Sequence, residues 1–194
     1  MAAYRGCACG AVSRAWKAGT ALMRELPIEA LRPDSFAPFG TVIQLQGALH
    51  YPINGGTTER FHALALTDTA TDGGATGISL FRGQGFALPF RLRLMERHPR
   101  SSQAFIPLAA GAADRYLVVV APAGDFAPGS LRAFLARGFQ GVQYARGVWH
   151  HPLIALDRDS DFIVVDRIAN DDNCEELALT AETVAVLRPP AWPD

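Results

Sequence analysis

The chain has 194 residues, of which 49% are hydrophobic and 19% charged, and its formal net charge is −1 at pH 7. This composition is that of a globular protein, and the length suffices for one well-buried domain but gives no argument for two. A net charge this close to zero gives no indication of binding to nucleic acid or to an anionic membrane surface. No apolar run is long enough for a bilayer-spanning helix.

The first 23 residues contain no acidic side chain, since Glu25 is the first carboxylate of the chain. This stretch has neither the apolar run of a secretory signal nor a clean amphipathic stripe. We therefore expect residues 1–23 to be a disordered tail or the product of a start codon assigned too early. Residues 24–187 are expected to form one catalytic domain, and the proline-rich residues 188–194 a frayed C-terminal tail.

Within residues 24–187, short alternating or apolar segments separated by glycine and proline predict an all-β fold with a few short helices. We expect a short helix within 28–36 and a closing helix over 180–187. Residues 130–138 fit a helix with a serine N-cap, but their many strand neighbours favour a strand. The other strands are expected at 41–45, in the second half of 53–66, and at 78–82, 92–96, 103–107, 115–121, 140–144, 148–156 and 161–168.

Lysine and cysteine usage excludes further classes. Lys17 is the only lysine, and it lies in the N-terminal tail, so enzymes that form a Schiff base are disfavoured. We expect neither pyridoxal phosphate nor a nucleotide as cofactor. Cys7 and Cys9 are too close in sequence to bridge each other, and Cys174 has no evident partner, which predicts a reduced, cytoplasmic protein.

The most informative stretch runs from Met95 to Pro107. Glu96 and His98 are two residues apart, so in a strand their side chains leave the same face. Pro99 and the Arg-Ser-Ser that follows it predict a turn, after which Gln103 opens a second strand. A carboxylate, an imidazole and an amide can thus converge, and His150 offers a fourth ligand-type group from a distant segment.

This arrangement resembles the cupin pattern, in which H-x-H-x4-E on two strands is answered by a distant G-x2-H. Here the pattern reads Glu96-x-His98-x4-Gln103 and Gly147-x2-His150. The resemblance implies an antiparallel β-barrel or jelly roll. One carboxylate, one amide and two imidazoles are an oxygen and nitrogen set that suits a divalent ion. The alternative for each histidine is a hydrogen-bonded residue inside the barrel.

Several further segments occur in the order found in the ureidoglycolate lyase family, which the region from about residue 24 to about 179 resembles. They are Phe39-Gly40, Asn54-Gly55, Glu59-Arg60-Phe61-His62, Glu96-Arg97-His98-Pro99, Gln103 to Pro107, Leu131 to Phe134, Gln140-Gly141-Val142-x-Tyr144, Trp149 to Leu153, Asp161-Phe162, Asp166-Arg167 and Asp172-Asn173-Cys174. The resemblance implies a homodimer that cleaves (S)-ureidoglycolate to glyoxylate and urea in allantoin and purine-nitrogen breakdown. A divalent metal such as nickel is sometimes associated with this family.

The candidate site residues follow from the spacing and the resemblance together. We expect Glu96, His98, Gln103 and His150 to be catalytic, and to be the metal ligands if a metal is bound. Because neighbours in a strand face opposite sides, His151 and Trp149 should point away from His150. A further group, expected to reach the mouth of the barrel and bind substrate, is Asn54, Arg60 and His62. The alternatives are turn chemistry for Asn54 and ordinary surface charge for Arg60.

Other functions fit the same barrel, because a fold does not fix an activity. The alternatives are a hydrolase that releases ammonia from ureidoglycolate, a metal-dependent oxygenase or isomerase, and a non-catalytic cupin that binds a small carboxylic acid. Gln103 in place of a charged or imidazole ligand argues against an iron oxygenase. Urea release would distinguish the lyase from the hydrolase.

Overall fold

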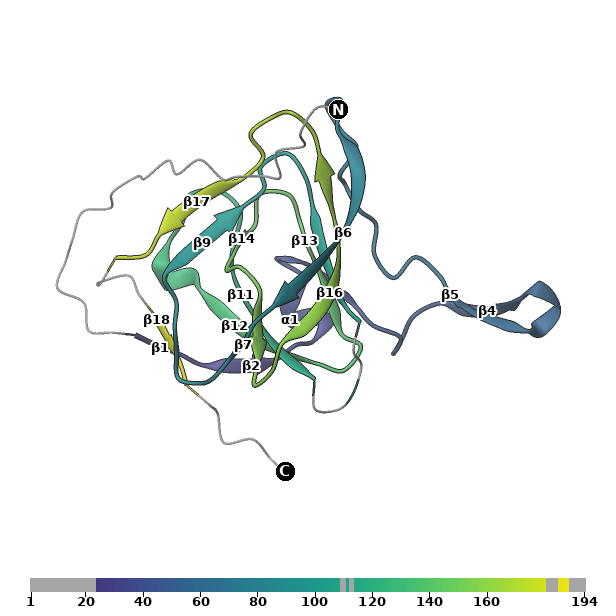
Figure 1. Ribbon diagram of the computed structural model, residues 1–194, viewed down its shortest axis with the longest axis horizontal. Helices are drawn as coiled ribbons and strands as arrows, with labels where there is room; N and C mark the ends of the chain where they lie inside the picture. The colour runs from purple at the N-terminus through teal and green to yellow at the C-terminus, as the bar shows by residue number, and fades with distance from the viewer. Residues whose placement is uncertain (1–23, 109–110, 112–113, 181–184, 189–194) are drawn as a thin grey trace.

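The computed structural model describes residues 24–108, 111, 114–180 and 185–188. Two sheets face each other to form a barrel-like body, and a third, smaller sheet covers one of them (Figure 1). The prediction of an all-β, cupin-like fold is confirmed. None of the helices in these ranges has the length and apolar character that a bilayer crossing requires.

The first of the two facing sheets has five strands, and all of its neighbouring pairs are antiparallel. In spatial order its strands are β3 (Gly40–Ile43), β13 (Gly141–Tyr144), β10 (Gln103–Pro107), β16 (Ser160–Ile168) and β6 (Ala75–Gly83).

The second facing sheet has eight strands. Its main path is β17 (Glu175–Ala178), β9 (Leu94–Arg97), β14 (Trp149–His150), β11 (Arg115–Ala121), β12 (Arg132–Arg137) and β2 (Ile28–Ala30), while β15 (Ile154–Leu156) pairs with β11 and with β7 (Gly85–Phe86). The covering sheet consists of β1 (Arg24–Leu26), β18 (Ala185–Leu187) and β8 (Phe90–Arg91).

The central strand β11 explains how the layers are held together. Its even-numbered residues Tyr116, Val118 and Val120 belong to the core between the two facing sheets. Leu117 and Val119 belong to a second core on the other face of the eight-stranded sheet. Because a strand alternates its side chains, a strand buried on both faces must be apolar throughout, as this one is.

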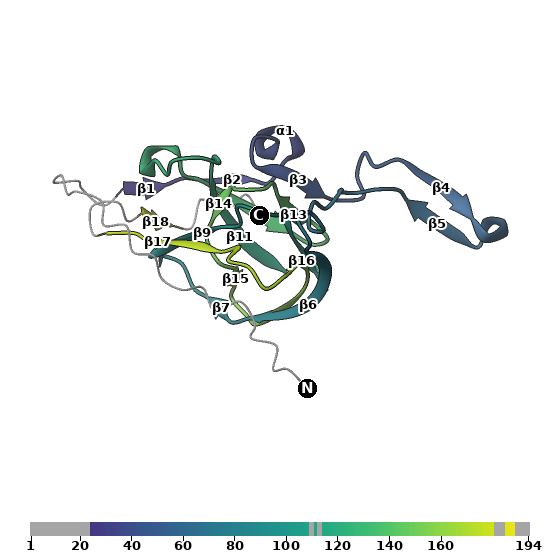
Figure 2. The ribbon, with the colours of Figure 1, turned by 90° about the horizontal axis from the view of Figure 1, so that it is seen from above.

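One hairpin leaves the body. It consists of β4 (His50–Ile53), the 3₁₀-helix η1 (Asn54–Gly56) and β5 (Thr58–Phe61). Its two strands form a sheet of their own, and both views show it extending away from the barrel (Figures 1 and 2). We call residues 50–61 the arm. The expected strand in the second half of 53–66 is therefore only partly correct.

The two helix predictions also need correction. Within 28–36, residues 28–30 form β2, which pairs in parallel with β12, and only Pro33–Phe36 form a helix, α1. Proline fits the first turn of a helix because it needs no amide there. Ala185–Leu187 form β18 beside β1 instead of the end of a closing helix. The strand favoured over 130–138 is confirmed as β12, which follows the 3₁₀-helix η2 (Pro128–Ser130).

Cys174 is disulfide-bonded. The expectation that this cysteine has no partner is therefore wrong, and cysteine usage no longer supports a reducing compartment. The N-terminal tail prediction and residues 189–194 of the C-terminal one lie outside the described residues.

Candidate active site

The turn between β9 and β10 positions three of the expected site residues. Met95 packs in the second core, so its neighbour Glu96 points to the opposite side, between the two facing sheets. His98 follows β9, and Gln103 opens β10 as predicted. Asn173 holds the turn in place. Its side chain accepts a hydrogen bond from the Arg100 amide and donates one to Ser101 Oγ, each at 2.8 Å.

The segment carrying His150 meets this turn directly. Gly147 adopts a left-handed conformation with φ +74°, which explains the glycine of the second motif. Its amide donates to the carbonyl of His98 at 2.9 Å. Val148 belongs to the core between the facing sheets and Trp149 to the second core. His150 therefore points into the barrel and pairs in register with Glu96.

Glu96, His98 and His150 converge on one point. Each offers a potential ligand atom, and these atoms all lie within 4.8 Å of one another. Glu96 Oε1 is 3.4 Å from His150 Nε2, and His98 Nε2 is 3.2 Å from Gln103 Oε1. His150 is only 1% exposed. The structure thus brings together all four of the residues that we expected to be catalytic.

Both imidazoles are oriented by backbone carbonyls. Nδ1–H of His98 donates to the carbonyl of Asn173 at 2.7 Å, and Nδ1–H of His150 donates to the carbonyl of Val148 at 3.0 Å. In the neutral imidazole the other nitrogen then has a free lone pair, which is how histidine ligands are held in many metal sites. In both residues Nε2 is the nitrogen that faces the cluster. The Gln103 amide can turn by 180°, so it can present either oxygen or NH₂ to it.

Tyr144 belongs to the site although the sequence analysis gave it no role. Its ring stacks on that of His150, with centroids 4.2 Å apart and planes 14° from parallel. It also pairs with Gln103 in the β13–β10 ladder. Burial is the main cause that raises the pKa of its phenol, and the nearby charge of Glu96 raises it further. Tyr144 therefore stays neutral at ordinary pH. The only sequence signal was its place in the Gln140-Gly141-Val142-x-Tyr144 segment.

Burial and neighbouring charges shift the pKa values of Glu96 and His98 for different reasons. Burial by itself raises the pKa of the Glu96 carboxyl, but its contact with the His150 imidazole and the charges of His98 and His151 outweigh burial and leave the pKa lowered. Burial, followed by the charge of His150, lowers the pKa of His98. At neutral pH these two shifts favour an ionised Glu96 carboxylate and a neutral His98 imidazole.

The donor set fits a divalent cation. His150 Nε2 is a buried nitrogen with no hydrogen-bond partner in the described structure, and Glu96 Oε1 lies 3.4 Å from it. A carboxylate and two imidazole nitrogens are ligands that transition metals accept. Glu96, Cys174 and Glu176 form a second close group. However, the Cys174 sulfur is in a disulfide and has no thiolate to offer.

His151 lies on the other face, as predicted. Its ring packs edge-on against Phe90 at 5.5 Å, and its Nδ1–H donates to the carbonyl of Pro152 at 2.7 Å. Trp149 packs against Phe126, and its indole N–H donates to the carbonyl of Gly124 at 2.9 Å. The two neighbours of His150 therefore support the second core.

The expected substrate-binding residues are not brought to this cluster within one chain. Asn54 and Arg60 lie on the arm and His62 directly after it (Figure 2). The Arg60 guanidinium lies 6.0 Å from the centre of the Tyr51 ring, and His62 Nδ1 lies 3.4 Å from the Tyr51 hydroxyl. In the described chain no hydrogen bond or ion pair joins these three residues to the cluster, and their role in substrate binding stays a prediction.

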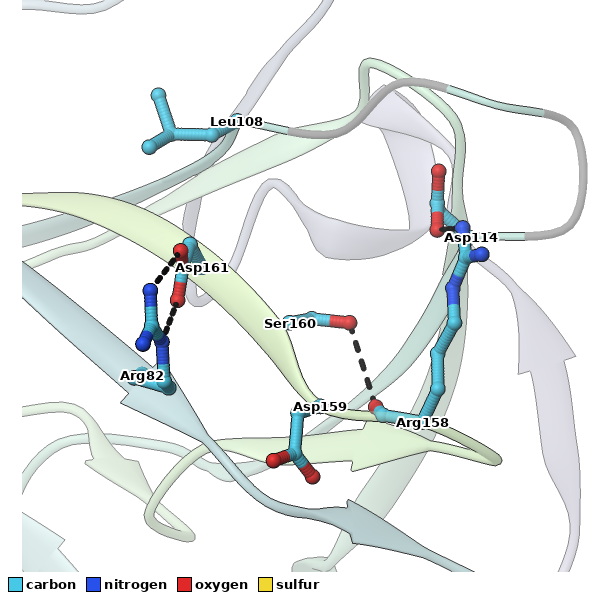
Figure 3. A pocket seen from close by; sticks show the side chains of 7 residues that line it. All are labelled: Arg82, Leu108, Asp114, Arg158, Asp159, Ser160 and Asp161. Atoms are coloured by element: carbon cyan, nitrogen blue, oxygen red, sulfur yellow. Dashed lines mark hydrogen bonds and ion pairs between the residues drawn. The ribbon is translucent and has the colours of Figure 1, made fainter.

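A hollow of about 580 Å³ lies elsewhere, at the end of β16 where Ser160 begins the strand (Figure 3). Its lining residues are Arg82, Leu108, Asp114, Arg158, Asp159, Ser160 and Asp161. Both of its arginines are paired, since Arg82 holds Asp161 with two 2.8 Å bonds and Arg158 pairs with Asp114. The third carboxylate, Asp159, accepts a hydrogen bond from the Gly85 amide at 3.0 Å. The Gln103 end of β10 lies beyond the Ala104–Val165 pair, towards the other end of β16, so this hollow is not part of the His98–His150 cluster.

Comparison with known proteins decides the family. The family model described as ureidoglycolate lyase matches residues 23–186, which is most of the chain. The chain belongs to the ureidoglycolate lyase family. All four clustered residues, Glu96, His98, Gln103 and His150, lie within the matched region.

Individual members of the ureidoglycolate lyase family are similar over most of their length. A protein of Burkholderia cepacia named ureidoglycolate lyase is 59% identical over 161 residues, covering 83% of this chain and 88% of that protein. One of Pseudomonas putida (strain W619) with the same name is 48% identical over 169 residues, covering 86% and 99%. Among solved structures, RmlC from Streptococcus suis in complex with dTDP-D-xylose matches with a TM-score of 0.40 at 10% identity, covering 76% of this chain and 74% of that one.

Proposed function

We propose that this protein is a ureidoglycolate lyase that cleaves (S)-ureidoglycolate to glyoxylate and urea. The observation that carries the proposal is the convergence of Glu96, His98 and His150 on one buried point, with both Nε2 atoms turned towards it. Membership of the family and the names of its similar members support the choice of substrate.

The reaction needs two proton movements. The substrate carbon bears a carboxylate, a hydroxyl group and a ureido nitrogen. Loss of the hydroxyl proton forms the carbonyl of glyoxylate as the carbon–nitrogen bond breaks, and the departing nitrogen takes up a proton to give urea. We assign these transfers to Glu96 and His150, whose facing atoms are 3.4 Å apart, so that one bound substrate molecule can contact both. Each positioned transfer contributes about 10²–10⁴-fold.

Glu96, His98, His150 and Gln103 would hold a divalent cation, nickel or a similar ion. His150 Nε2 would then be a ligand, and the proton transfers would fall to the second carboxylate oxygen of Glu96. Such a cation supplies a positive charge that binds the substrate oxygens and stabilises negative charge developing on them. The chain itself orients the two imidazoles through the carbonyls of Asn173 and Val148 and covers His150 with the ring of Tyr144. This support keeps water and alternative rotamers away from the reacting groups.

We also propose that the protein is a homodimer and that the arm completes the site of a second copy. A two-stranded hairpin is marginally stable alone in water, so an arm that pairs only with itself needs a surface to pack against. The outer face of the five-stranded sheet offers Ile78 and Leu80, which are 75% and 55% exposed. The arm would then bring Asn54, Arg60 and His62 to a barrel other than their own.

Arg60 would supply a cation for the substrate carboxylate in such a dimer. The arginine beside the cluster in sequence, Arg97, is already engaged, because it binds Glu175 at 2.6 Å and the carbonyl of Gly124 at 2.8 Å. Arg60 has no ion pair among the described residues. We further propose that the protein acts in the cytoplasm, because the family takes part in purine-nitrogen breakdown.

The test is to identify the products. Purified protein is incubated with (S)-ureidoglycolate, and glyoxylate, urea and ammonia are quantified separately. We expect glyoxylate and urea in equal amounts and no ammonia above the uncatalysed background. Release of ammonia would show the hydrolase reaction, and absence of turnover with and without added divalent metal would favour a binding protein.

A further inference from the structure

One inward-facing carboxylate, Asp166, has no role in the scheme above. Along β16, Phe162 and Val164 point into the core between the facing sheets, where they are 1% and 0% exposed. The alternation of a strand places Asp166 on the same inner face. It thus continues the inner row of β16 beyond Val164, where the core residues end.

The ladder between β10 and β16 places Asp166 beside the site. Ala104 pairs with Val165 in this antiparallel ladder, and Phe105 pairs with Val164. One step further along the same register, Gln103 and Asp166 stand opposite each other. Since Gln103 also pairs with Tyr144 on its other side, these three residues form one inner row across the five-stranded sheet.

One oxygen of the half-buried Asp166 carboxylate lacks a hydrogen-bond partner. This oxygen, Oδ1, is itself buried and has no partner in the described structure. Only one other buried side-chain atom in the described ranges is in this state, and it is His150 Nε2. Unsatisfied buried polar atoms are rare, and each is costly. Both exceptions occur on the inner side of the barrel, where a bound polar ligand would supply the missing partners.

Among the described residues on the β6 side, no side chain donates a hydrogen bond to Asp166 Oδ1. Gly77 of β6 pairs with Asp166 in the ladder, and it has no side chain to donate a hydrogen bond. A Cβ at Gly77 would lie 3.3 Å from Asp166 Oδ1 and 2.3 Å from the side chain of Ile168. The next residue, Arg167, faces away and is engaged by Asp171 and by the carbonyls of Thr71 and Asp72.

We propose that the Asp166 carboxylate binds the ureido group of the substrate by accepting its N–H groups. The inference rests on the proposed function, because it requires a substrate with a ureido end. A urea unit presents neighbouring N–H donors, which match the two oxygens of a carboxylate. The same negative charge repels the substrate carboxylate, so Asp166 also fixes which end of the substrate faces Glu96, His98 and His150.

The test uses two probes that the enzyme cannot cleave. N-carbamoylglycine keeps the carboxylate and ureido ends but lacks the hydroxyl group, whereas glycolate keeps the carboxylate and hydroxyl ends but lacks the ureido group. Binding of each probe to the full-length protein is measured by calorimetry and by competition with ureidoglycolate. For Asp166→Asn we expect binding of N-carbamoylglycine to weaken about 10- to 100-fold, the scale of a lost hydrogen bond to a charged group, and binding of glycolate to change less than about twofold.

Two controls separate this role from a structural one. Asp161→Asn removes another carboxylate of β16, one that pairs with Arg82 at the opposite end of the strand, and should leave both probes unaffected. Thermal unfolding of Asp166→Asn should occur at or above the wild-type temperature, because the change removes a half-buried charge with one unsatisfied oxygen. Equal weakening of both probes, or no weakening of either, would overturn the inference.

Failure of the inference and failure of the proposed function give different results. The binding measurements require no turnover, so they test Asp166 even if the products are not glyoxylate and urea. If wild-type protein releases urea from ureidoglycolate but Asp166→Asn binds N-carbamoylglycine normally, only the inference is overturned. If wild-type protein shows no turnover and binds neither probe, both are overturned.

Discussion

The amide of Gly147 donates a hydrogen bond to the carbonyl of His98, 2.9 Å away, and so joins the two distant halves of the site. The residue that makes this contact has φ +74°, a conformation that side chains disfavour. This one backbone contact holds together two segments that lie 49 positions apart in the sequence, from His98 to Gly147. The position of His150 depends on it.

The first prediction concerns this glycine. Gly147→Ala should destabilise the protein by about 1–2 kcal/mol, because alanine is strained at this φ. Simple crowding is not the cause, since an added Cβ would approach only Ala123, at an ordinary 3.7 Å. We expect a lower unfolding temperature and lower kcat/KM. A variant with wild-type stability would show that the loop accommodates alanine by changing its conformation.

Gln103 gives the second prediction. Gln103→Ala removes the amide beside His98 Nε2, and by analogy with residues that orient metal or substrate ligands we expect kcat/KM to fall about 10- to 100-fold with the fold retained. Gln143 is a matched control, because it is also buried but bonds the carbonyl of Leu66 instead. Gln143→Ala should affect the unfolding temperature more than kcat/KM. Similar kinetic losses in both variants would remove Gln103 from the site.

The sequence was sufficient for the fold class and for the centre of the site because both depend on local alternation. Two-residue spacing places Glu96 and His98 on one face, and the same rule separates His150 from Trp149 and His151. The apolar run of β11 was equally readable, since burial on both faces leaves no polar position. These signals require no knowledge of which strands pair.

The features that sequence reasoning missed depend on distant contacts. Ala185–Leu187 form a strand only because β1, about 160 residues earlier, lies beside them. Asp166 has a place in the inner row only through the register of β10 and β16. Tyr144 stacks on His150 across two sheets. The arm is the opposite case: the sequence shows its motif, but nothing local reveals that it leaves the barrel.

The third prediction compares two adjacent histidines. His150→Ala removes the buried imidazole that faces Glu96, and we expect urea formation to fall by at least about 10²-fold. Metal content after reconstitution with nickel should also fall, because one nitrogen ligand is lost. His151→Ala removes a ring that packs on Phe90, so it should lower stability and cost much less activity. Equal losses, or a larger loss at His151, would contradict the inner-face assignment.

The last prediction tests whether the arm serves a second copy. Arg60→Ala should weaken substrate binding, raising KM about 10-fold or more through loss of a charge-assisted contact to the substrate carboxylate, while the cluster of Glu96, His98 and His150 stays intact. Glu59→Ala is the control on the same strand, since Glu59 pairs with His50 within the arm. That variant should change KM little.

Mixed dimers then distinguish the two possible sources of Arg60. If Arg60 reaches the partner's site, a dimer of one Arg60→Ala chain and one His150→Ala chain has one site with an intact barrel and an intact arm. Random assembly makes about half of the dimers mixed, and each has one such site of two, so about a quarter of wild-type sites should be restored. Co-expressed chains should therefore recover about that share of activity at low substrate concentration. If each arm serves its own barrel, no site regains both groups, and the mixture should show no more than the average of the two variants.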